Sequence, residues 1–210
     1  LDLTALDVSH PVMESIYRQF FDEPRFRPSP ITTVRLAGGL IGRKAGEGFY
    51  VYADGQKQVP AEPPVPALPE GLKVWVSPKH AEGYARASAL VEKLGATLVT
   101  GATPDADALI IVTPFGDDVS TSVSAQGLNA GRTVGLDTLY AFDGAKRRTL
   151  MVSPATEGKW RDAAHALLAA DGVPVTVIED SPGFVAQRIV AMIVNIASDI
   201  AQQQIATPKD

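Results

Sequence analysis

An unbroken apolar run at 108–113, Ala-Leu-Ile-Ile-Val-Thr, limits the fold of this chain more than any other feature. A strand that is apolar on both faces is typical of a parallel sheet with helices packed on both sides. Other candidates alternate around this run, the strands at 72–77, 96–100, 133–139, 149–153 and 173–178 and the helices at 81–94, 119–128 and 155–170. The alternation predicts an α/β domain with a right-handed, mainly parallel sheet.

The chain before this domain has a helical pattern, and we expect a helix within 4–22. Its apolar residues recur every four positions, at Val8, Val12, Ile16 and Phe20, as on an amphipathic helix. Pro11 suits a first helical turn, so this helix is expected to begin near 9–11. A shorter helix is expected at 31–40, and 49–52 forms either a short strand or a packed tail. A region of about 50 residues buries too little surface to fold well alone, so we expect it to belong to a larger domain.

Two further segments complete the organisation. Residues 53–71 contain five prolines and few bulky side chains, which predicts an extended, semi-rigid linker. A long helix is expected at 184–204, after Pro182 and Gly183. Its isoleucines Ile189, Ile193, Ile196 and Ile200 share one side. An isolated helix with such a stripe needs a partner to cover it.

Composition excludes several classes of function. The net charge is −5 without a Lys/Arg-rich block, which argues against nucleic-acid binding. Cysteine is absent, so disulfides, thiol catalysis and cysteine-bound metals are excluded. The apolar runs are shorter than the roughly 20 residues of a membrane-spanning helix, and no signal peptide opens the chain. We therefore expect a cytoplasmic protein without membrane partners, and Leu1 in place of Met suggests a processed or truncated product.

A glycine-rich segment at 36–52, Leu-Ala-Gly-Gly-Leu-Ile-Gly-Arg-Lys-Ala-Gly-Glu-Gly-Phe-Tyr-Val-Tyr, follows Glu-Pro-Arg-Phe-Arg-Pro-Ser-Pro at 23–30. Together with 1–22, these segments resemble the C-terminal helical domain of 3-hydroxyacyl-CoA dehydrogenases. Asp-Ser-Pro-Gly-Phe-Val-Ala-Gln-Arg at 180–188 resembles the crossing from that family's nucleotide-binding domain into its helical domain.

The order of these segments is similar to the long bacterial form of the family, in which a complete dehydrogenase is followed by a second, degenerate copy. The resemblance implies an end of a first helical domain at 1–52, a linker at 53–71, a degenerate Rossmann-like domain at 72–180 and the first helix of a second helical domain at 181–210. The full-length parent is expected to use NAD and 3-hydroxyacyl-CoA, such as 3-hydroxybutyryl-CoA or 3-hydroxyadipyl-CoA. We expect both ends of this chain to be cut within helical domains.

The α/β domain lacks the usual dinucleotide fingerprint. Such a domain needs glycines directly after its first strand, so that the backbone approaches the pyrophosphate at a helix N-terminus. Here Ser-Pro-Lys-His-Ala-Glu-Gly at 77–83 takes that place, and Pro78 has no N–H to offer. No NAD is expected on these residues.

The family's catalytic residues are also replaced. The resemblance implies a His after a Gly-Leu pair, a Glu on the next strand that orients it, and an Asn in the Pro-Gly-Phe helix. Asp137 follows Gly135-Leu136 in this sequence, Met151 stands near the Glu position, and Gln187 stands where the Asn would be. We therefore expect no catalytic residue here, because a general base needs its carboxylate partner.

Arg43, Lys44, Gly46, Gly48 and Phe49 are the candidate substrate-binding residues. Arg43 and Lys44 could hold the nucleotide phosphates of CoA, since arginine matches phosphate oxygens bidentately. The favoured alternative is that both residues cap carbonyls at a helix end and that the glycines serve turns.

The remaining polar residues are interpreted as structural. His10, His80 and His165 lack metal-ligand spacing and are expected at the surface or in caps. Asp117 and Asp118 are expected to cap the helix that follows them. No metal is expected, and the serines at 120–124 lack the nucleophile elbow of a hydrolase.

Two functions remain open. The chain is either a non-catalytic portion of a 3-hydroxyacyl-CoA dehydrogenase, with packing, dimerisation and acyl-pocket roles, or a module that binds acyl-CoA or a nucleotide without redox chemistry. The first predicts a homo-oligomer or an intramolecular pseudo-dimer. A receiver-like or flavodoxin-like signalling domain is disfavoured, because no acidic cluster follows the first strand.

Overall fold

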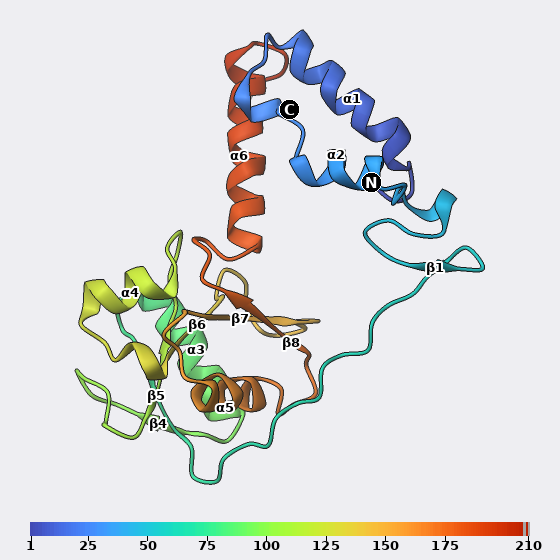
Figure 1. Cartoon of the computed structure of the whole chain (residues 1–210). Coiled ribbons are helices and arrows are strands. Elements are labelled where there is room, and N and C mark those ends of the chain that lie inside the picture. Colours follow the sequence, from blue (N-terminus) through green and yellow to red (C-terminus); the bar gives the residue numbers. More distant parts are fainter. Residues whose placement is uncertain (208, 210) are drawn as a thin grey trace. The chain divides into compact units, whose positions relative to one another are not determined.

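The computed structural model describes residues 1–207 and 209 of the 210-residue chain. The chain divides into two compact units, Leu1–Glu62 and Pro63–Asp210 (Figure 1). Both hydrophobic clusters of buried residues lie in the second unit.

The first unit is built from two helices, α1 (Leu6–Gln19) and α2 (Pro30–Ala37), with short 3-10 turns η1 (Pro24–Phe26) and η2 (Arg43–Ala45). The buried His10 of α1 contacts Thr32 of α2 through Nδ1 and Oγ1 at 3.0 Å. The Thr32 hydroxyl also donates to the Ser29 carbonyl at 2.7 Å, so the contact is fixed to the start of α2. The expectation of a surface His10 is therefore wrong, because α2 packs over it.

Helix α1 begins one turn earlier than its proline predicted. Leu6 is fully buried and its N–H donates to the Ile41 carbonyl at 2.8 Å. These tertiary contacts extend the helix toward the N-terminus and leave Pro11 in its interior. A proline inside a helix removes one helical hydrogen bond. For this reason the sequence pattern alone predicted that the helix would begin near Pro11.

The first unit ends in a tight hairpin. Strands β1 (Tyr52–Ala53) and β2 (Gln56–Lys57) pair antiparallel around Asp54 and Gly55. Asp54 has a φ of 51° and Gly55 a φ of 72°, and two positive φ values suit a two-residue hairpin turn of Asp-Gly type. The hairpin thus takes up the first residues of the segment that composition indicated as linker.

The second unit contains a six-stranded sheet of order β4-β3-β5-β6-β7-β8. Its strands are β3 (Lys73–Val76), β4 (Thr97–Val99), β5 (Leu109–Val112), β6 (Thr133–Leu136), β7 (Arg148–Val152) and β8 (Val175–Glu179). All neighbours pair in parallel except β6 and β7, which are antiparallel. The predicted mainly parallel α/β sheet is confirmed, and every residue of β5 is buried as its apolar run indicated.

Helices cover both faces of this sheet. The helices of the unit are α3 (Ala81–Lys93), α4 (Val119–Gln126), α5 (Gly158–Leu168) and α6 (Ala186–Gln202), with a 3-10 turn η3 (Ala130–Arg132). One apolar cluster joins α3 and α5 to the strand residues that include Val74 and Ile111. The other joins α4 to the opposite face through Trp75 and Ile110. The alternation of strand side chains between two faces produces these two layers.

The start of α6 is set by the core rather than by helix signals. Phe184 has a φ of 49°, outside the helical region, and its side chain is fully buried against the second cluster. A Cβ placed on Gly135 would lie 3.4 Å from the Phe184 ring and 2.9 Å from Val119. The ring therefore fills the space that a glycine in β6 leaves open, and α6 begins two residues later than expected.

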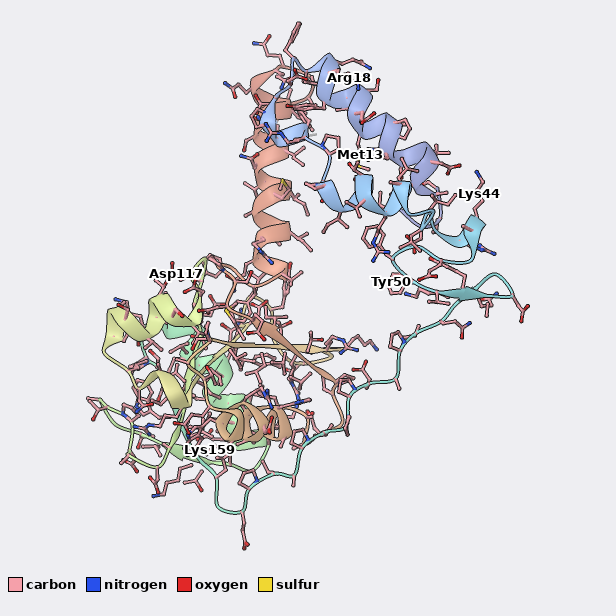
Figure 2. All side chains as sticks on the ribbon, in the orientation of Figure 1. Met13, Arg18, Lys44, Tyr50, Asp117 and Lys159 are labelled. Carbon is pink, nitrogen blue, oxygen red and sulfur yellow. The ribbon has the colours of Figure 1, made fainter. Side chains whose placement is uncertain are left out.

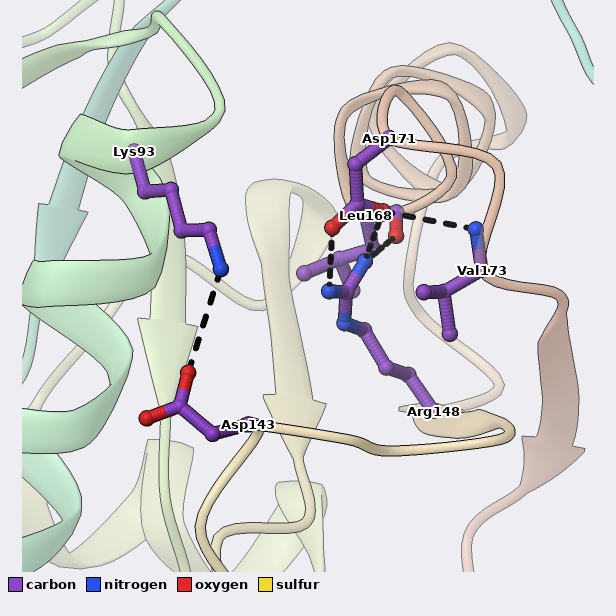
Figure 3. A network of polar contacts seen from close by, with 6 residues as sticks. All are labelled: Lys93, Asp143, Arg148, Leu168, Asp171 and Val173. Carbon is purple, nitrogen blue, oxygen red and sulfur yellow. Dashed lines mark hydrogen bonds and ion pairs between the residues drawn. The ribbon is translucent and has the colours of Figure 1, made fainter.

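An ion pair between a buried arginine and a partly exposed aspartate ties β7 to the loop after α5 (Figure 3). The Arg148 guanidinium donates to both Asp171 carboxylate oxygens at 2.7 Å and to the Leu168 carbonyl at 2.5 Å. The Arg148 side chain is only 2% exposed. The hydrogen bonds from Arg148 lower the pKa of Asp171 from 3.8 to about 2.

Asp171→Asn should destabilise the second unit. Because the folded-state pKa of Asp171 is depressed, its contribution is complete above pH 3.8 and is lost as the pH falls through about 2. The Asp171 side chain is 30% exposed, so solvent screens part of this contribution, and at neutral pH we expect the free energy of unfolding to fall by about 1 kcal/mol. Trp75 and Trp160 both lie in this unit, so tryptophan fluorescence in urea measures its unfolding.

Asp143→Asn is the matched control. Asp143 lies 3.9 Å from Lys93 and its side chain is 96% exposed, so water screens the pair and no measurable change is expected. An equal loss of stability in both variants would contradict the role assigned to the Arg148–Asp171 pair.

Candidate functional site

A cavity of about 540 Å³ opens at the carboxyl ends of β3, β5 and β6. Its lining includes His80, Gly83 and Arg86 from the start of α3 and Thr113 and Thr138 from the strand ends. In open α/β sheets, ligands bind in the crevice outside the carboxyl ends of the strands. The sheet therefore retains the place of a nucleotide site.

Gly83 retains one structural feature of a dinucleotide fold. In a G-x-G-x-x-G spacing after β3, the three glycine positions correspond to Pro78, His80 and Gly83. A Cβ on Gly83 would lie 2.3 Å from Thr113 Oγ1 and 3.0 Å from Thr138 Oγ1. The third glycine of the fingerprint permits such close packing of helix on strand. Sequence reasoning missed this residue because it sought the complete motif, although the spacing of Gly83 alone was a usable signal.

The other two fingerprint positions do not fit NAD. Pro78 has no N–H, and the N–H of Lys79 donates to the Ser77 hydroxyl at 3.3 Å. Glu82 lies in the first turn of α3, where a carboxylate repels an incoming phosphate. The Glu82 carboxylate pairs with Arg86, and Arg86 also donates to the carbonyls of Thr138 at 2.6 Å and Leu139 at 2.8 Å. The polar groups at 77–86, where a pyrophosphate would bind, are thus already bonded to other groups of the protein.

The structure brings Asp137 and Gln187 together just after the end of β6. The Gln187 amide nitrogen donates to Asp137 Oδ1 at 3.0 Å and to the Pro114 carbonyl at 3.2 Å. The Gln187 oxygen accepts the Gly116 N–H at 2.9 Å. Asp137 Oδ1 also accepts the Leu139 N–H at 3.1 Å. The amide therefore joins the ends of β5 and β6 to α6.

Met151, the third replaced position, lies in the core. It pairs with Gly135 across β6 and β7 and is fully buried among apolar residues. A thioether is uncharged and only a weak hydrogen-bond acceptor, so Met151 cannot orient a neighbouring base or stabilise its protonated form. Asp137 and Gln187 therefore bond to each other, while Met151 packs in the apolar cluster.

Asp180 fixes the entry to α6. Its carboxylate accepts the N–H of Val119 at 2.8 Å and that of Ser120 at 3.2 Å, and also the Ser120 hydroxyl. Asp118 caps α4 by accepting the Thr121 N–H at 2.7 Å, as expected. Asp117 instead accepts the Gly183 N–H at 3.0 Å through its backbone carbonyl. Asp180 thus satisfies two free N–H groups at the start of α4.

A second cavity, of about 630 Å³, borders α6. Apolar residues Val190, Ala191 and Val194 line it together with Gln187 and Arg188. Phe115 and Leu139 line both this cavity and the one at α3. These two residues therefore form part of the wall of both cavities.

In the first unit, the glycine-rich segment binds the chain's own carboxylate. Asp2 is buried, and it accepts the N–H groups of Phe49 and Tyr50 at 3.0 Å each and the Tyr52 hydroxyl at 3.2 Å. A Cβ on Gly48 would lie 2.8 Å from Asp2 Oδ1 and 2.5 Å from Gly42 Cα. Burial raises the pKa of Asp2, but these hydrogen bonds outweigh it and hold the pKa below 3.8. Asp2 was not predicted from the sequence, because its partners lie almost 50 residues away.

The five candidate substrate-binding residues separate in the structure. Arg43 and Phe49 line a cavity of about 690 Å³ in the first unit. Lys44 (Figure 2) instead pairs with Asp7 of α1 at 2.5 Å. Gly46 has a φ of 81° and ends η2, so it serves a turn, and Gly48 serves the approach to Asp2. The cavity thus contains two of the five.

Two kinds of feature are absent from the described part of the chain. Among residues 1–207 and 209, no group of three or more His, Cys, Asp or Glu side chains is placed to hold a metal ion. None of the helices in those residues has the length and apolar character needed to cross a membrane.

Comparison with known proteins identifies the class. A family model described as the C-terminal domain of 3-hydroxyacyl-CoA dehydrogenase matches residues 1–52. The 3-hydroxyadipyl-CoA dehydrogenase of Escherichia coli (strain K12) is 26% identical over 211 residues, which cover 100% of this chain and 38% of that protein. A probable 3-hydroxybutyryl-CoA dehydrogenase of Deinococcus radiodurans is 41% identical over 51 residues, 24% of this chain and 18% of that protein.

A solved structure shares the fold. The crystal structure of 3-hydroxybutyryl-CoA dehydrogenase from Escherichia coli K12 aligns with a TM-score of 0.68 and 23% identity, over 99% of this chain and 38% of that one. The chain therefore spans about two fifths of the length of the relatives that it matches throughout. The predicted resemblance is confirmed: the chain is a relative of the 3-hydroxyacyl-CoA dehydrogenases, and its first 52 residues match their C-terminal domain.

Gly83→Ala should destabilise the second unit. Alanine favours a helix by up to about 1 kcal/mol over glycine, but the new Cβ would overlap Thr113. We expect a net loss of about 1–2 kcal/mol, as for an overpacked core, measured by tryptophan fluorescence in urea. Gly158→Ala is the control, since the nearest atom to its Cβ is 3.8 Å away, and it should be neutral or stabilising. Equal effects of the two variants would remove the close-packing argument.

Proposed function

We propose that the chain is a non-catalytic, C-terminal portion of an NAD-dependent 3-hydroxyacyl-CoA dehydrogenase, the enzyme that oxidises 3-hydroxyacyl-CoA to 3-oxoacyl-CoA. One observation carries this proposal. The whole chain aligns with 3-hydroxyadipyl-CoA dehydrogenase, while Asp137, Met151 and Gln187 bond or pack within the fold. The portion would then support the enzyme by packing, by contributing to the acyl pocket and by pairing subunits.

The proposal divides the chain into four parts. Residues 1–52 end a first helical domain, and 53–71 link it to the next. Residues 72–180 form a degenerate dinucleotide-type domain, and 181–210 begin a second helical domain. Any NAD and acyl-CoA chemistry then belongs to residues outside these four parts.

The chain by itself should not form NADH from NAD and 3-hydroxybutyryl-CoA. Asp137 already accepts two hydrogen bonds, and no charged partner lies at Met151, so a base for the hydroxyl proton is missing. Absorbance of NADH measures the reaction, with a complete dehydrogenase of this family as the positive control. Turnover by the purified chain above the rate of a blank would refute the non-catalytic assignment.

Helix α6 supports the pairing of subunits. Its isoleucines Ile189, Ile193, Ile196 and Ile200 are 55%, 61%, 44% and 37% exposed. Their spacing of four, three and four residues places them within an arc of about 60° on a helix of 3.6 residues per turn. Apolar residues at this spacing form the seam of paired helices. A second copy of α6 presents isoleucines at the same spacing and could cover this seam. We therefore propose a homo-oligomer with α6 at its interface.

Ile193→Glu should weaken this association. A carboxylate in an apolar seam loses its hydration without gaining a partner, so we expect the chain to shift toward the monomer in light scattering coupled to size exclusion. Gln202→Glu is the control, since it adds the same charge to the opposite side of α6, where Gln202 is exposed. A wild-type chain that is monomeric at all concentrations would disprove the interface.

A nucleotide- or acyl-CoA-binding module without redox chemistry is the second candidate. The cleft at the carboxyl ends of β3, β5 and β6 favours it, since this is where such folds bind ligands. The buried Thr113 hydroxyl beside it has no hydrogen-bond partner among the described residues. Calorimetry with NAD and with an acyl-CoA decides, because the absence of heat from both excludes this role.

A further inference from the structure

The loop between β6 and β7 contains an exposed Asp-Gly pair, Asp143–Gly144. The chain has two other such pairs, at 54–55 and 171–172. The main chain rearranges most readily where a side-chain carboxyl is followed by glycine, because glycine has no side chain to hinder attack of its nitrogen on that carboxyl. The pairs at 143–144 and 171–172 lie in the same α/β unit, so their surroundings can be compared directly.

Asp143 lies in an open turn. The Ala145 N–H donates to the Phe142 carbonyl at 3.1 Å, and Gly144 has a φ of 73°, as at the third residue of a type II turn. A Cβ on Gly144 would meet no atom within 4 Å. The Asp143 side chain is 96% exposed and the Lys93 ammonium lies 3.9 Å from it (Figure 3). Water screens a pair at this distance, so the carboxyl can rotate toward the main chain.

The pair Asp171–Gly172 has the same sequence in closed surroundings. Both Asp171 carboxylate oxygens accept N–H groups of Arg148 at 2.7 Å (Figure 3). The Gly172 N–H donates to the Ala169 carbonyl at 2.9 Å, whereas the Gly144 N–H has no backbone acceptor among the described residues. The carboxyl and the nitrogen that would react at 171–172 are therefore both held by other groups.

We propose that Asp143 is a modification site, at which the chain converts to isoaspartate without an enzyme. The Gly144 nitrogen attacks the side-chain carboxyl carbon of Asp143, and a C–N bond forms while a hydroxyl and the amide proton leave as water. Water then adds to the main-chain carbonyl of the cyclic imide and breaks the bond from this carbonyl to the nitrogen. The main chain now continues through the former side chain, and the former main-chain carbonyl is a carboxylate. One water leaves and one enters, so the mass is unchanged.

Two restraints slow the same reaction at Asp171. The first step needs the neutral carboxyl, because a carboxylate is a poor target for a nucleophile. Arg148 holds the pKa of Asp171 at about 2, so the neutral form is rare at neutral pH. Attack also needs the Gly172 N–H to leave its acceptor, which requires local opening of the chain. The Asp143 turn has neither of these hydrogen-bond restraints.

The modification would alter a loop that contributes to the core and to a cavity. Phe142 packs against the apolar cluster of α3 and α5, and Leu139 lines the cavity at the start of α3. Isoaspartate adds a methylene to the main chain within the turn, so the Phe142 carbonyl and the Ala145 N–H no longer keep their spacing. It also moves the negative charge of residue 143 onto a group attached directly to the main chain.

Peptide mapping of the full chain after prolonged incubation at neutral pH tests the site. Mass spectrometry with fragmentation at the Cα–Cβ bond distinguishes isoaspartate from aspartate of the same mass. We expect isoaspartate to form about tenfold faster or more at Asp143 than at Asp171, where local opening must come first. In urea the two rates should become similar, because unfolding removes the contacts of Asp171. Asp143→Glu should abolish the product at 143 and leave Asp171 unchanged, since its carboxyl lies one carbon further from the nitrogen.

Two outcomes would overturn the proposal. One is an equal rate at Asp143 and Asp171 in the folded chain. The other is a folded chain that forms no isoaspartate at Asp143 over the period in which the chain in urea forms it, since the turn would then protect the residue. The measurement involves no nucleotide, acyl-CoA or association of subunits, so its result does not depend on the proposed function.

Discussion

The second unit depends on one amide that joins three chain segments. Gln187 of α6 binds the Pro114 carbonyl, the Gly116 N–H and the Asp137 carboxylate, and it is 7% exposed. An amide has both donors and an acceptor, so it can satisfy a carbonyl, an N–H and a carboxylate at once. Loss of any contact would leave a buried polar group unpaired, which is costly. The ends of β5 and β6 and the start of α6 are therefore held in one arrangement, and the cleft takes its shape from it.

The α/β unit keeps the helix packing of a dinucleotide-binding fold but differs from it at the residues that would face a phosphate. Gly83 still allows α3 to lie against Thr113, so the helix begins where a phosphate-binding helix would. Pro78 and Glu82 remove a donor and add a negative charge at the same place. The close packing of Gly83 on Thr113 is needed for the core of the sheet. A backbone N–H at position 78 would serve only a ligand. A cleft thus remains at the carboxyl ends of the strands.

The glycine-rich segment of the first unit also uses a ligand-like arrangement of N–H groups for a contact within the protein. Its N–H groups are arranged as for an anion, but the anion is the carboxylate of Asp2. Gly42 and Gly48 are required because Asp2 and the opposing backbone approach within the space of a side chain. The segment thereby closes the unit on its own first residues. Arg43, which takes no part in that contact, is left to face the cavity.

The sequence by itself determined the elements of the α/β sheet and the family relationship. Apolar runs such as 108–113 and the helices between them follow from local periodicity, and the motif at 36–52 is contiguous in the chain. Only the tertiary structure decided the helix starts at Leu6 and Ala186, the burial of His10, and the partners of Gln187 and Asp2. Each of these depends on contacts between residues about 20 or more positions apart, and a local pattern contains no information about which distant groups will meet.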